Sequence, residues 1–156
     1  MMGSIQVKDV ISLLEASSIL VSEGEPIQLV IERFAKDSKL IGFFVIDESR
    51  RYKGVITRST LLQWTKRQLG DIPEGFDWKI IDEFKAKVNS TKALDLVSKG
   101  SVEAYIRMSD PISKALSLLM LYSLIDLPVL NETGEIIGDL NLSELLNKIL
   151  KDSQME

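Results

Sequence analysis

The sequence predicts an α+β fold, with α/β-type connections, built from two similar halves that each run strand, helix, strand, strand, helix. The first observation is an internal repeat: Ile27 and Ile112 stand 85 residues apart, and Phe43 and Leu127 stand 84 apart, at matching places. The second and third observations are that each half contains one helix with a single apolar face and one strand of continuous apolar residues. A duplicated unit this short predicts two pseudo-symmetric half-domains packed through their sheets, with matching clefts between them.

Each half begins with a short strand and a helix. Residues 19–21 form a brief apolar run, and Pro26 suits the first turn of a helix, where its missing N–H would be unpaired in any case. Asp110, just before Pro111, is expected to cap the matching helix in the second half. Apolar residues then recur at spacings of three and four, which predicts one buried stripe per helix: Ile27, Val30, Ile31 and Phe34, then Ile112, Ala115, Leu116 and Leu119.

The middle of each half predicts two strands and a closing helix. Apolar runs at 43–46 and 127–130 are typical of strands buried on both faces, and a polar turn follows each. The turn at 131–134 has a hairpin sequence. The next strands begin at Gly54 and Ile136, and helices are expected over 59–69 and 143–150. We interpret Trp64 as a core or interface residue rather than a platform for a ligand.

The chain is therefore divided into a first repeat (1–70), a structured connection (71–91) and a second repeat (92–156). Within the connection, residues 71–75 are expected to form a turn. The spacing of Trp78, Ile81, Phe84 and Val88 then predicts a moderately amphipathic helix. Residues 89–91 are expected to cap a short helix at 93–97, which has a counterpart at 7–14. Short extra helices thus precede both repeats.

Composition excludes several classes of function. The chain has 156 residues, a net charge of −4, no cysteine and no histidine. Zinc sites built from Cys and His are excluded, so no metal site is expected, and the commonest general base is absent. The acidic balance argues against nucleic-acid binding. The longest apolar stretch, 115–125, falls short of the roughly 20 residues that span a bilayer, and no signal peptide is evident. We expect a cytoplasmic protein that binds no membrane.

In order and spacing, these motifs resemble the cystathionine β-synthase (CBS) domain, in the tandem arrangement called a Bateman module. The likeness covers about 7–69 and 93–151. The residues that carry it are the helix openings Glu25-Pro26 and Asp110-Pro111, the strand ends Val45-Ile46-Asp47 and Val129-Leu130-Asn131, and the strand-to-helix segments 54–62 and 138–146.

The resemblance implies a regulatory module rather than an enzyme. Such pairs bind adenosine-containing ligands, among them AMP, ADP, ATP (with Mg²⁺), S-adenosylmethionine and sometimes NAD, in clefts between the halves. They often form homodimers, and they signal by a change in the packing of the dimer or of a partner, here an unknown effector protein.

The resemblance also points to site residues. The family places Thr or Ser, then two residues, then Asp after the glycine-started strand. The hydroxyl lies near a helix start, where phosphate is favoured, and the Asp accepts hydrogen bonds from the ribose. In the first repeat Thr57 keeps the hydroxyl, Thr60 stands at the Asp position, and Arg58 is a phosphate candidate. The alternative is that Thr57 and Ser59 only cap the helix.

In the second repeat Asn141 replaces the hydroxyl and Glu144 the Asp. Asp139 lies on the same side of its strand as Asn141 because strand side chains alternate. If Asp139 and Glu144 both face the cleft, the cleft is acidic. An acidic cleft disfavours bare phosphate and suits a neutral nucleoside, the sulfonium of S-adenosylmethionine, or a nucleotide neutralised by Mg²⁺. The alternative is that Glu144 only complements the helix dipole and Asp139 is solvated.

By the same resemblance, the adenine is expected to be held by backbone groups and apolar side chains near residues 19–21, which include Val21, and near residues 105–107, which include Ile106. Tyr105 is a candidate for stacking on the base, or a plain core residue, and Arg107 is a candidate for a phosphate contact. Both repeats depart from the family pattern at the ribose position. The alternative function is therefore a structural dimerisation scaffold with degenerate, non-binding sites.

Overall fold

The computed structural model describes residues 5–13, 19–70 and 77–155. The chain divides into two compact units: unit 1 draws on 1–17, 49–52 and 100–156, and unit 2 on 18–48 and 53–99. The order strand, helix, strand, strand, helix occurs twice along the chain, so the predicted α+β fold with two repeats is confirmed. That the halves pack through their sheets stays a prediction.

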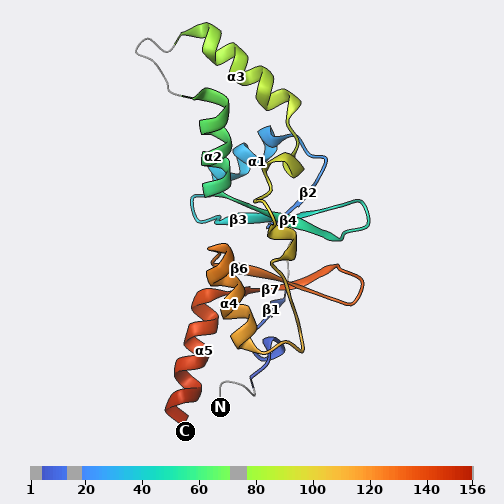
Figure 1. Ribbon diagram of the computed structural model, residues 1–156, viewed down its shortest axis with the longest axis vertical. Coiled ribbons are helices and arrows are strands. Elements are labelled where there is room, and N and C mark those ends of the chain that lie inside the picture. The colour runs from blue at the N-terminus through green and yellow to red at the C-terminus, as the bar shows by residue number, and fades with distance from the viewer. Residues whose placement is uncertain (1–4, 14–18, 71–76, 156) are drawn as a thin grey trace. The chain divides into compact units, whose positions relative to one another are not determined.

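Unit 2 holds a three-stranded sheet in the order β2-β3-β4, with β2 parallel to β3. Helices lie against one face of this sheet (Figure 1). The elements are β2 (Leu20–Ser22), α1 (Ile27–Lys36), β3 (Gly42–Ile46), β4 (Tyr52–Thr57), α2 (Arg58–Leu69) and α3 (Trp78–Ser90).

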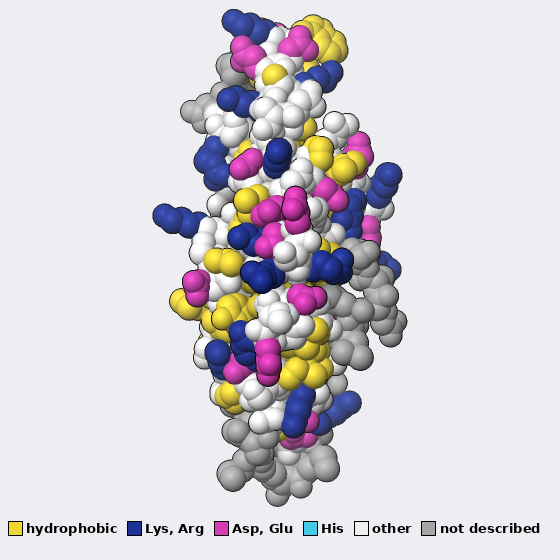
Figure 2. Space-filling model, turned by 90° about the vertical axis from the view of Figure 1, so that its right-hand side faces the viewer, with side chains coloured by type: hydrophobic (Ala, Val, Ile, Leu, Met, Phe, Trp, Pro, Cys, Tyr) yellow, Lys and Arg dark blue, Asp and Glu magenta, His cyan; other side chains and the backbone are white. Residues whose placement is uncertain are grey.

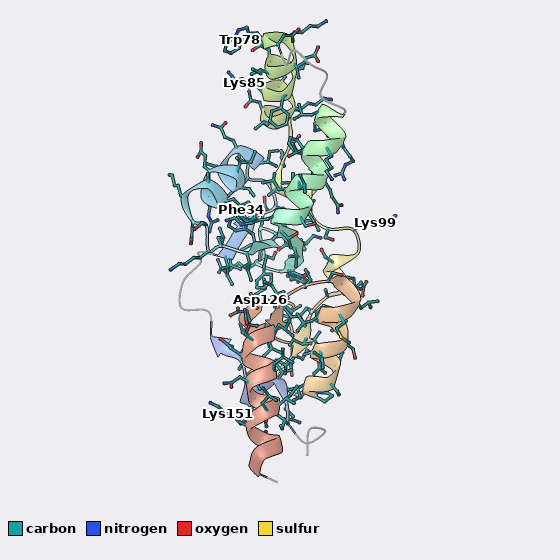
Figure 3. All side chains as sticks on the ribbon, turned by 90° about the vertical axis from the view of Figure 1, so that its left-hand side faces the viewer. Phe34, Trp78, Lys85, Lys99, Asp126 and Lys151 are labelled. Atoms are coloured by element: carbon teal, nitrogen blue, oxygen red, sulfur yellow. The ribbon has the colours of Figure 1, made fainter. Side chains whose placement is uncertain are left out.

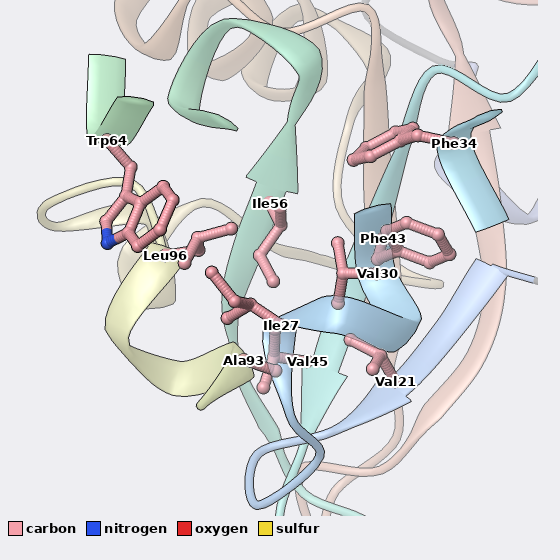
Figure 4. Packing of buried hydrophobic residues seen from close by; sticks show 10 residues of the cluster. All are labelled: Val21, Ile27, Val30, Phe34, Phe43, Val45, Ile56, Trp64, Ala93 and Leu96. Atoms are coloured by element: carbon pink, nitrogen blue, oxygen red, sulfur yellow. The ribbon is translucent and has the colours of Figure 1, made fainter. Parts of the chain in front are cut away.

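The core of unit 2 forms where the apolar stripe of α1 meets the sheet (Figure 4). Ile27 and Val30 from α1 pack with Ile56 from β4, and all three are fully buried. Trp64 of α2 is 4% exposed, which confirms its interpretation as a core residue. Phe84 of α3 lies with its ring centroid 5.6 Å from that of Trp64. The predicted amphipathic helix of the connection therefore forms and covers the core.

The segment after α3 also belongs to unit 2. A short 3-10 helix, Ala93–Leu96, follows a bend at which the amide of Ala93 donates to the carbonyl of Glu25 at 2.7 Å. The expected cap at 89–91 is wrong, because α3 continues to Ser90 and the carboxylate of Asp95 accepts instead from the amide of Lys92. The turn expected at 71–75 lies outside the described residues.

Unit 1 holds a four-stranded sheet in the order β1-β7-β6-β5, and its two helices lie on one side of that sheet (Figure 1). Strands β6 and β7 are antiparallel, with Leu127 opposite Leu140, and both of these side chains are fully buried. The elements are β1 (Ser12–Leu13), β5 (Ile106–Arg107), α4 (Ile112–Tyr122), β6 (Asp126–Leu130), β7 (Ile136–Asn141) and α5 (Leu142–Met155).

The beginning of the chain packs in unit 1, beside the second repeat. The amide of Val7, in the 3-10 helix Val7–Asp9, donates to the carbonyl of Asp110 at 2.8 Å, and β1 pairs with β7. Each repeat thus has its leading segment packed on the other repeat. The compact units reflect which segments pack together. The predicted division by sequence repeat, into 1–70, 71–91 and 92–156, stays a prediction.

The hairpin tip at 49–52 belongs to unit 1 as well. The Tyr52 hydroxyl is buried and donates to the carbonyls of Ser101 at 2.6 Å and Ala104 at 3.2 Å. Its amide donates to Gly134. Burial raises the pKa of Tyr52 well above its usual value, so this phenol stays a neutral donor at any physiological pH.

Asp110 does not cap α4. Pro111 occupies the cap position, and no side chain caps the helix there. The Asp110 carboxylate accepts from the amide of Arg107 at 2.8 Å and from the ammonium of Lys114 at 3.3 Å. It therefore closes the loop between β5 and α4, where the Asp110 amide also donates to the Arg107 carbonyl at 3.0 Å.

Candidate functional site

The predicted site residues fall into two sets at equivalent places in the two units. The first half-site consists of Val21, Thr57, Arg58 and Thr60 in unit 2. The second half-site consists of Ile106, Arg107, Asn141 and Glu144 in unit 1. In each, one part comes from the short strand at one side of the middle strand, and the other part comes from the strand-to-helix junction on its opposite side.

The two threonines of the first half-site hold the start of α2. The hydroxyl of Thr57 accepts from the amide of Thr60 at 3.1 Å. The hydroxyl of Thr60 accepts from the amide of Thr57 at 2.8 Å and donates to the Thr57 carbonyl at 2.8 Å. This reciprocal arrangement satisfies backbone groups that the helix leaves unpaired. The interpretation of Thr57 as a helix cap is confirmed, and Thr60 supplies no carboxylate at the ribose position.

Arg58 is bound to the end of α1. Its guanidinium donates to the carbonyls of Leu40 at 2.8 Å, Asp37 at 2.7 Å and Phe34 at 3.1 Å. It also lies 4.7 Å from the centroid of the Phe34 ring, a residue labelled in Figure 3. The carbonyls of Phe34 and Asp37 lie at the end of α1, where a helix has unpaired acceptors, and that of Leu40 lies in the loop that follows. A phosphate contact by Arg58, which stays a prediction, would have to replace these bonds.

Val21 places its side chain in the core of unit 2 rather than on the surface. Beside it, the guanidinium of Arg33 donates to the carbonyl of Leu20 at 2.9 Å and lies 4.4 Å over the ring of Phe43. What β2 can offer a ligand is therefore mainly its backbone. Sequence reasoning missed Arg33, whose one signal was its place in the last turn of α1, where basic residues complement the helix dipole.

In the second half-site, Ile106 is fully buried and Arg107 is half-buried. The guanidinium of Arg107 donates to the carbonyl of Asn131 at 2.7 Å and lies 5.6 Å from the centroid of the Tyr105 ring. The ring proposed to stack on a base thus already stacks under an arginine. Both side chains remain at the surface rather than in the core.

Asn141 and Glu144 stand at the start of α5. The side-chain oxygen of Asn141 accepts from the amide of Ser143 at 2.8 Å, so Asn141 caps the helix. The amide of Leu142 donates to the carbonyl of Ile125 at 2.9 Å, which fastens this start to β6. Glu144 is exposed in the first turn, where helix amides favour a negative charge.

A further acid, Asp126, lies beside this junction and was missed from the sequence (Figure 3). Asp126 is opposite Asn141 and Asp139 is opposite Pro128, so both acids share one face of the sheet. The Oδ1 atom of Asp126 is buried without a hydrogen-bond partner. Burial, a hydrogen bond to Asp139 and the charges of Asp139 and Glu144 raise the pKa of Asp126 to about 9.

The expected acidic character of the second repeat is therefore present, with three carboxyl groups that we call the acid cluster (Asp126, Asp139 and Glu144). Asp139 is half-buried and lies on the same face of the sheet as Asp126, so it is not fully solvated. The signal that could have revealed Asp126 was a charged residue opening an otherwise apolar strand. The same positions of the first repeat, 84 residues earlier, hold Gly42, Val55 and Thr60.

The remaining surface gives little support to other classes of site. On the face shown in Figure 2, acidic and basic side chains are interspersed, so that face carries no single-sign field of the kind nucleic acid requires. Among the described residues, no group of acidic side chains is arranged to hold a metal ion. Within those same ranges, no helix is long and apolar enough to cross a membrane.

Comparison with protein families identifies the chain. The model of the CBS domain matches residues 7–67 and 95–151, one match for each repeat. The chain therefore belongs to the CBS domain family and carries a tandem pair of these domains. Pairs of this kind are generally regulatory rather than catalytic. No curated protein matches the chain.

Solved structures of similar fold are CBS-pair proteins. A CBS domain-containing protein from Thermotoga maritima is 26% identical, with a TM-score of 0.69 over 94% of this chain and 95% of that one. CBSX2, solved in complex with AMP, is 19% identical, with a TM-score of 0.70 over 96% of this chain and 99% of that one. A CBS domain-containing protein of unknown function from Bacillus anthracis is also 19% identical, with a TM-score of 0.70 over 96% of each chain.

Proposed function

We propose that this CBS pair senses an adenosine-containing ligand and that the second half-site is where the ligand binds. The observation that carries the proposal is the exposed carboxylate of Glu144 at the ribose position, in the first turn of α5. In the first half-site the ribose position holds Thr60, which has no carboxylate, and Thr57, Thr60 and Arg58 make hydrogen bonds within unit 2. The AMP complex of CBSX2, a protein of the same fold, supports an adenosine derivative as the ligand.

The charge of the second half-site narrows the ligand. Three carboxyl groups gather at the start of α5, and a phosphate there would meet like charge within a few ångströms. A ligand with a neutral or cationic group beside its ribose suits this acidic site. S-adenosylmethionine has such a group in its sulfonium. In ATP, bound Mg²⁺ neutralises part of the negative charge of the phosphates. AMP and ADP without a metal are expected to bind more weakly.

A thermal-denaturation panel with AMP, ADP, ATP with Mg²⁺, and S-adenosylmethionine tests the proposal. A ligand present at 100 times its dissociation constant raises the free energy of unfolding by about 2.7 kcal/mol. We expect such a rise with S-adenosylmethionine or ATP with Mg²⁺, and its loss in Glu144→Gln. Glu132→Gln, which removes an exposed acid from the turn after β6, is the matched control. No rise with any of the four would remove this function.

We propose that the output runs through a homodimer in the cytoplasm, which an effector protein then reads. Apolar side chains exposed on α4, its following loop and α5 support self-association: Met120, Leu121, Ile125, Leu146 and Leu150. The sequence from Leu116 to Ile125 contains no charged residue. Two copies can meet there about a two-fold axis without opposing like charges, and interface cores are depleted in charge.

Sedimentation of the purified chain tests the dimer. The first repeat has Lys36 where the second has Leu121, and Lys66 where the second has Leu150. The double variant Leu121→Lys, Leu150→Lys is therefore compatible with the fold, and it is expected to be monomeric where the parent is dimeric. A monomeric parent at micromolar concentration contradicts the proposed output.

A structural dimerisation scaffold is the second candidate function. The observation that favours it is that Thr57, Thr60 and Arg58 already make hydrogen bonds inside unit 2. A scaffold predicts a stable dimer whose sedimentation and thermal midpoint do not change with any of the four nucleotides. A ligand-dependent change in either measurement excludes it.

A further inference from the structure

The Asp126 carboxyl, whose Oδ1 atom is buried although the residue as a whole is half-buried, poses an electrostatic problem that the fold alone does not require. Its Oδ1 atom is the one side-chain polar atom, among the described residues, that is buried without a hydrogen-bond partner. Burying an ionised carboxylate with an unpaired oxygen is strongly unfavourable, so such a group either pairs with a cation or keeps its proton. The equivalent residue in unit 2 is Gly42, which shows that this sheet position needs no carboxyl.

Among the described residues around Asp126, no Lys or Arg side chain forms an ion pair with its carboxyl group. Strand β7 presents Asp139, and α5 presents Glu144. Helix α4 carries Tyr122 near its end and Lys114 near its start, where the ammonium pairs with Asp110. Strand β5 carries Arg107, whose guanidinium donates to Asn131. Within the described ranges, no ion pair reaches Asp126 or Asp139.

Asp126 and Asp139 lie close enough across the two strands for one of them to keep a proton and share it with the other. Asp126 and Asp139 lie on one face of adjacent antiparallel strands, one diagonal step apart. Side chains in that relation are within reach of one another. Two carboxyl groups that share a site cannot both ionise readily, and one retains its proton and donates it to the other.

We propose that Asp126 and Asp139 share one proton at neutral pH, and that its loss under alkaline conditions loosens the paired ends of β6 and β7 together with the start of α5. Burial, the largest cause, and the neighbouring acids raise the pKa of Asp126 to about 9, which agrees with this assignment. The protonated form is favoured in the folded state. The contribution of Asp126 to the free energy of unfolding is therefore greatest at low pH and declines as the pH rises from about 4 toward 9.

The bonds that this change weakens are identifiable. The Leu142 amide donates to Ile125, the residue before Asp126, and the Asn141 side chain accepts from the Ser143 amide. Full ionisation of the acid cluster places three negative charges around this junction. Because Asn141 and Glu144 belong to the second half-site, a proton on Asp126 controls whether that half-site is formed. The proton switch itself rests on the acid cluster and not on the proposed ligand.

Carbon-13 NMR of the side-chain carboxyl groups tests the shared proton directly. In the full chain labelled at aspartate, the Asp126 carboxyl is assigned by its absence in Asp126→Asn and followed from pH 3 to pH 10. We expect its midpoint several pH units above the value of about 4 that an unperturbed aspartate has. A midpoint close to 4 overturns the proposal. The titration is carried out on the parent protein without any ligand.

Denaturation by urea at pH 6.0, 7.5 and 9.0 tests the consequence. The urea midpoint of the parent is expected to fall with each step, and that of Asp126→Asn to fall much less. Glu132→Gln, which removes an exposed acid outside the cluster, is expected to follow the parent. Parallel declines in all three proteins contradict the proposal. If Asp126→Asn does not fold, Asp139→Asn replaces it, and the NMR midpoint of Asp126 is then expected to fall by a unit or more.

Discussion

The strand-to-helix junctions of the two repeats share a backbone plan and differ in chemistry. Both place a capping side chain at the last strand residue, Thr57 in one and Asn141 in the other. Around Asn141 the second repeat gathers the acid cluster, whereas the matching positions in the first repeat carry no charge. The two repeats therefore share the position of this junction and differ in the residues placed on it.

The difference extends to the arginines. In unit 2, Arg58 and Arg33 each combine a bond to a backbone carbonyl with a stack on a phenylalanine, so the cationic groups are used to close the fold. In unit 1, Arg107 makes one such bond and stacks on Tyr105 at the surface. The first junction thus uses its arginines within the unit, and the proposed function assigns the contacts with a ligand to the second.

The largest expected effect comes from adding a side chain at Gly42. A Cβ there would meet the backbone oxygen of Ile56 at 2.5 Å, and a backbone atom cannot move aside cheaply. Gly42→Ala is expected to lower the free energy of unfolding by about 3 kcal/mol, measured by urea denaturation. Gly24→Ala, where nothing lies within 4 Å of the added atom, is the control. Equal losses in both variants would show that the close approach is absent.

Removing the guanidinium of Arg58 should have the next effect. Arg58→Ala breaks three hydrogen bonds to the end of α1 and the loop that follows it, and also the contact with Phe34. We expect a loss of about 2 kcal/mol, because hydrogen bonds to charged groups are stronger than neutral ones but exchange with water. Arg67→Ala, at an exposed position of the same helix, should cost far less. If the two variants lose equal stability, Arg58 is not the closing group that its contacts indicate.

The smallest effect is expected at the end of α4. Ser123 has a φ of 54°, in the left-handed region that favours glycine, and its amide donates to Leu119 and Met120. Ser123→Gly should therefore raise the free energy of unfolding by about 1 kcal/mol. Ser109→Gly, at a residue without positive φ, should lower it or leave it unchanged. Destabilisation by Ser123→Gly in a thermal scan would contradict the assigned conformation.

Much of the fold could be predicted from the sequence because the signals are local and occur twice. The stripes beginning at Ile27 and Ile112 predicted α1 and α4, and the helical spacing around Trp64 placed it in the core. A repeat in sequence carries no information about which copy a leading segment packs on. The pairing of β1 with β7 could therefore not be predicted.

The candidate site was predictable only in part, for a similar reason. Thr57 and Glu144 follow from the order of residues along one junction. The engagement of Arg58 depends on carbonyls 18 to 24 residues away. The partnership of Asp126 with Asp139 depends on the register of two strands, and register emerges from the folded sheet.

Isothermal titration of S-adenosylmethionine, and separately of AMP, into the parent, Glu144→Gln and Thr60→Val tests the central contrast between the two junctions. The account predicts that the parent binds S-adenosylmethionine more tightly than AMP, that Glu144→Gln weakens this binding about tenfold, or about 1.4 kcal/mol, and that Thr60→Val leaves it unchanged. Binding that is lost in Thr60→Val and kept in Glu144→Gln would contradict it.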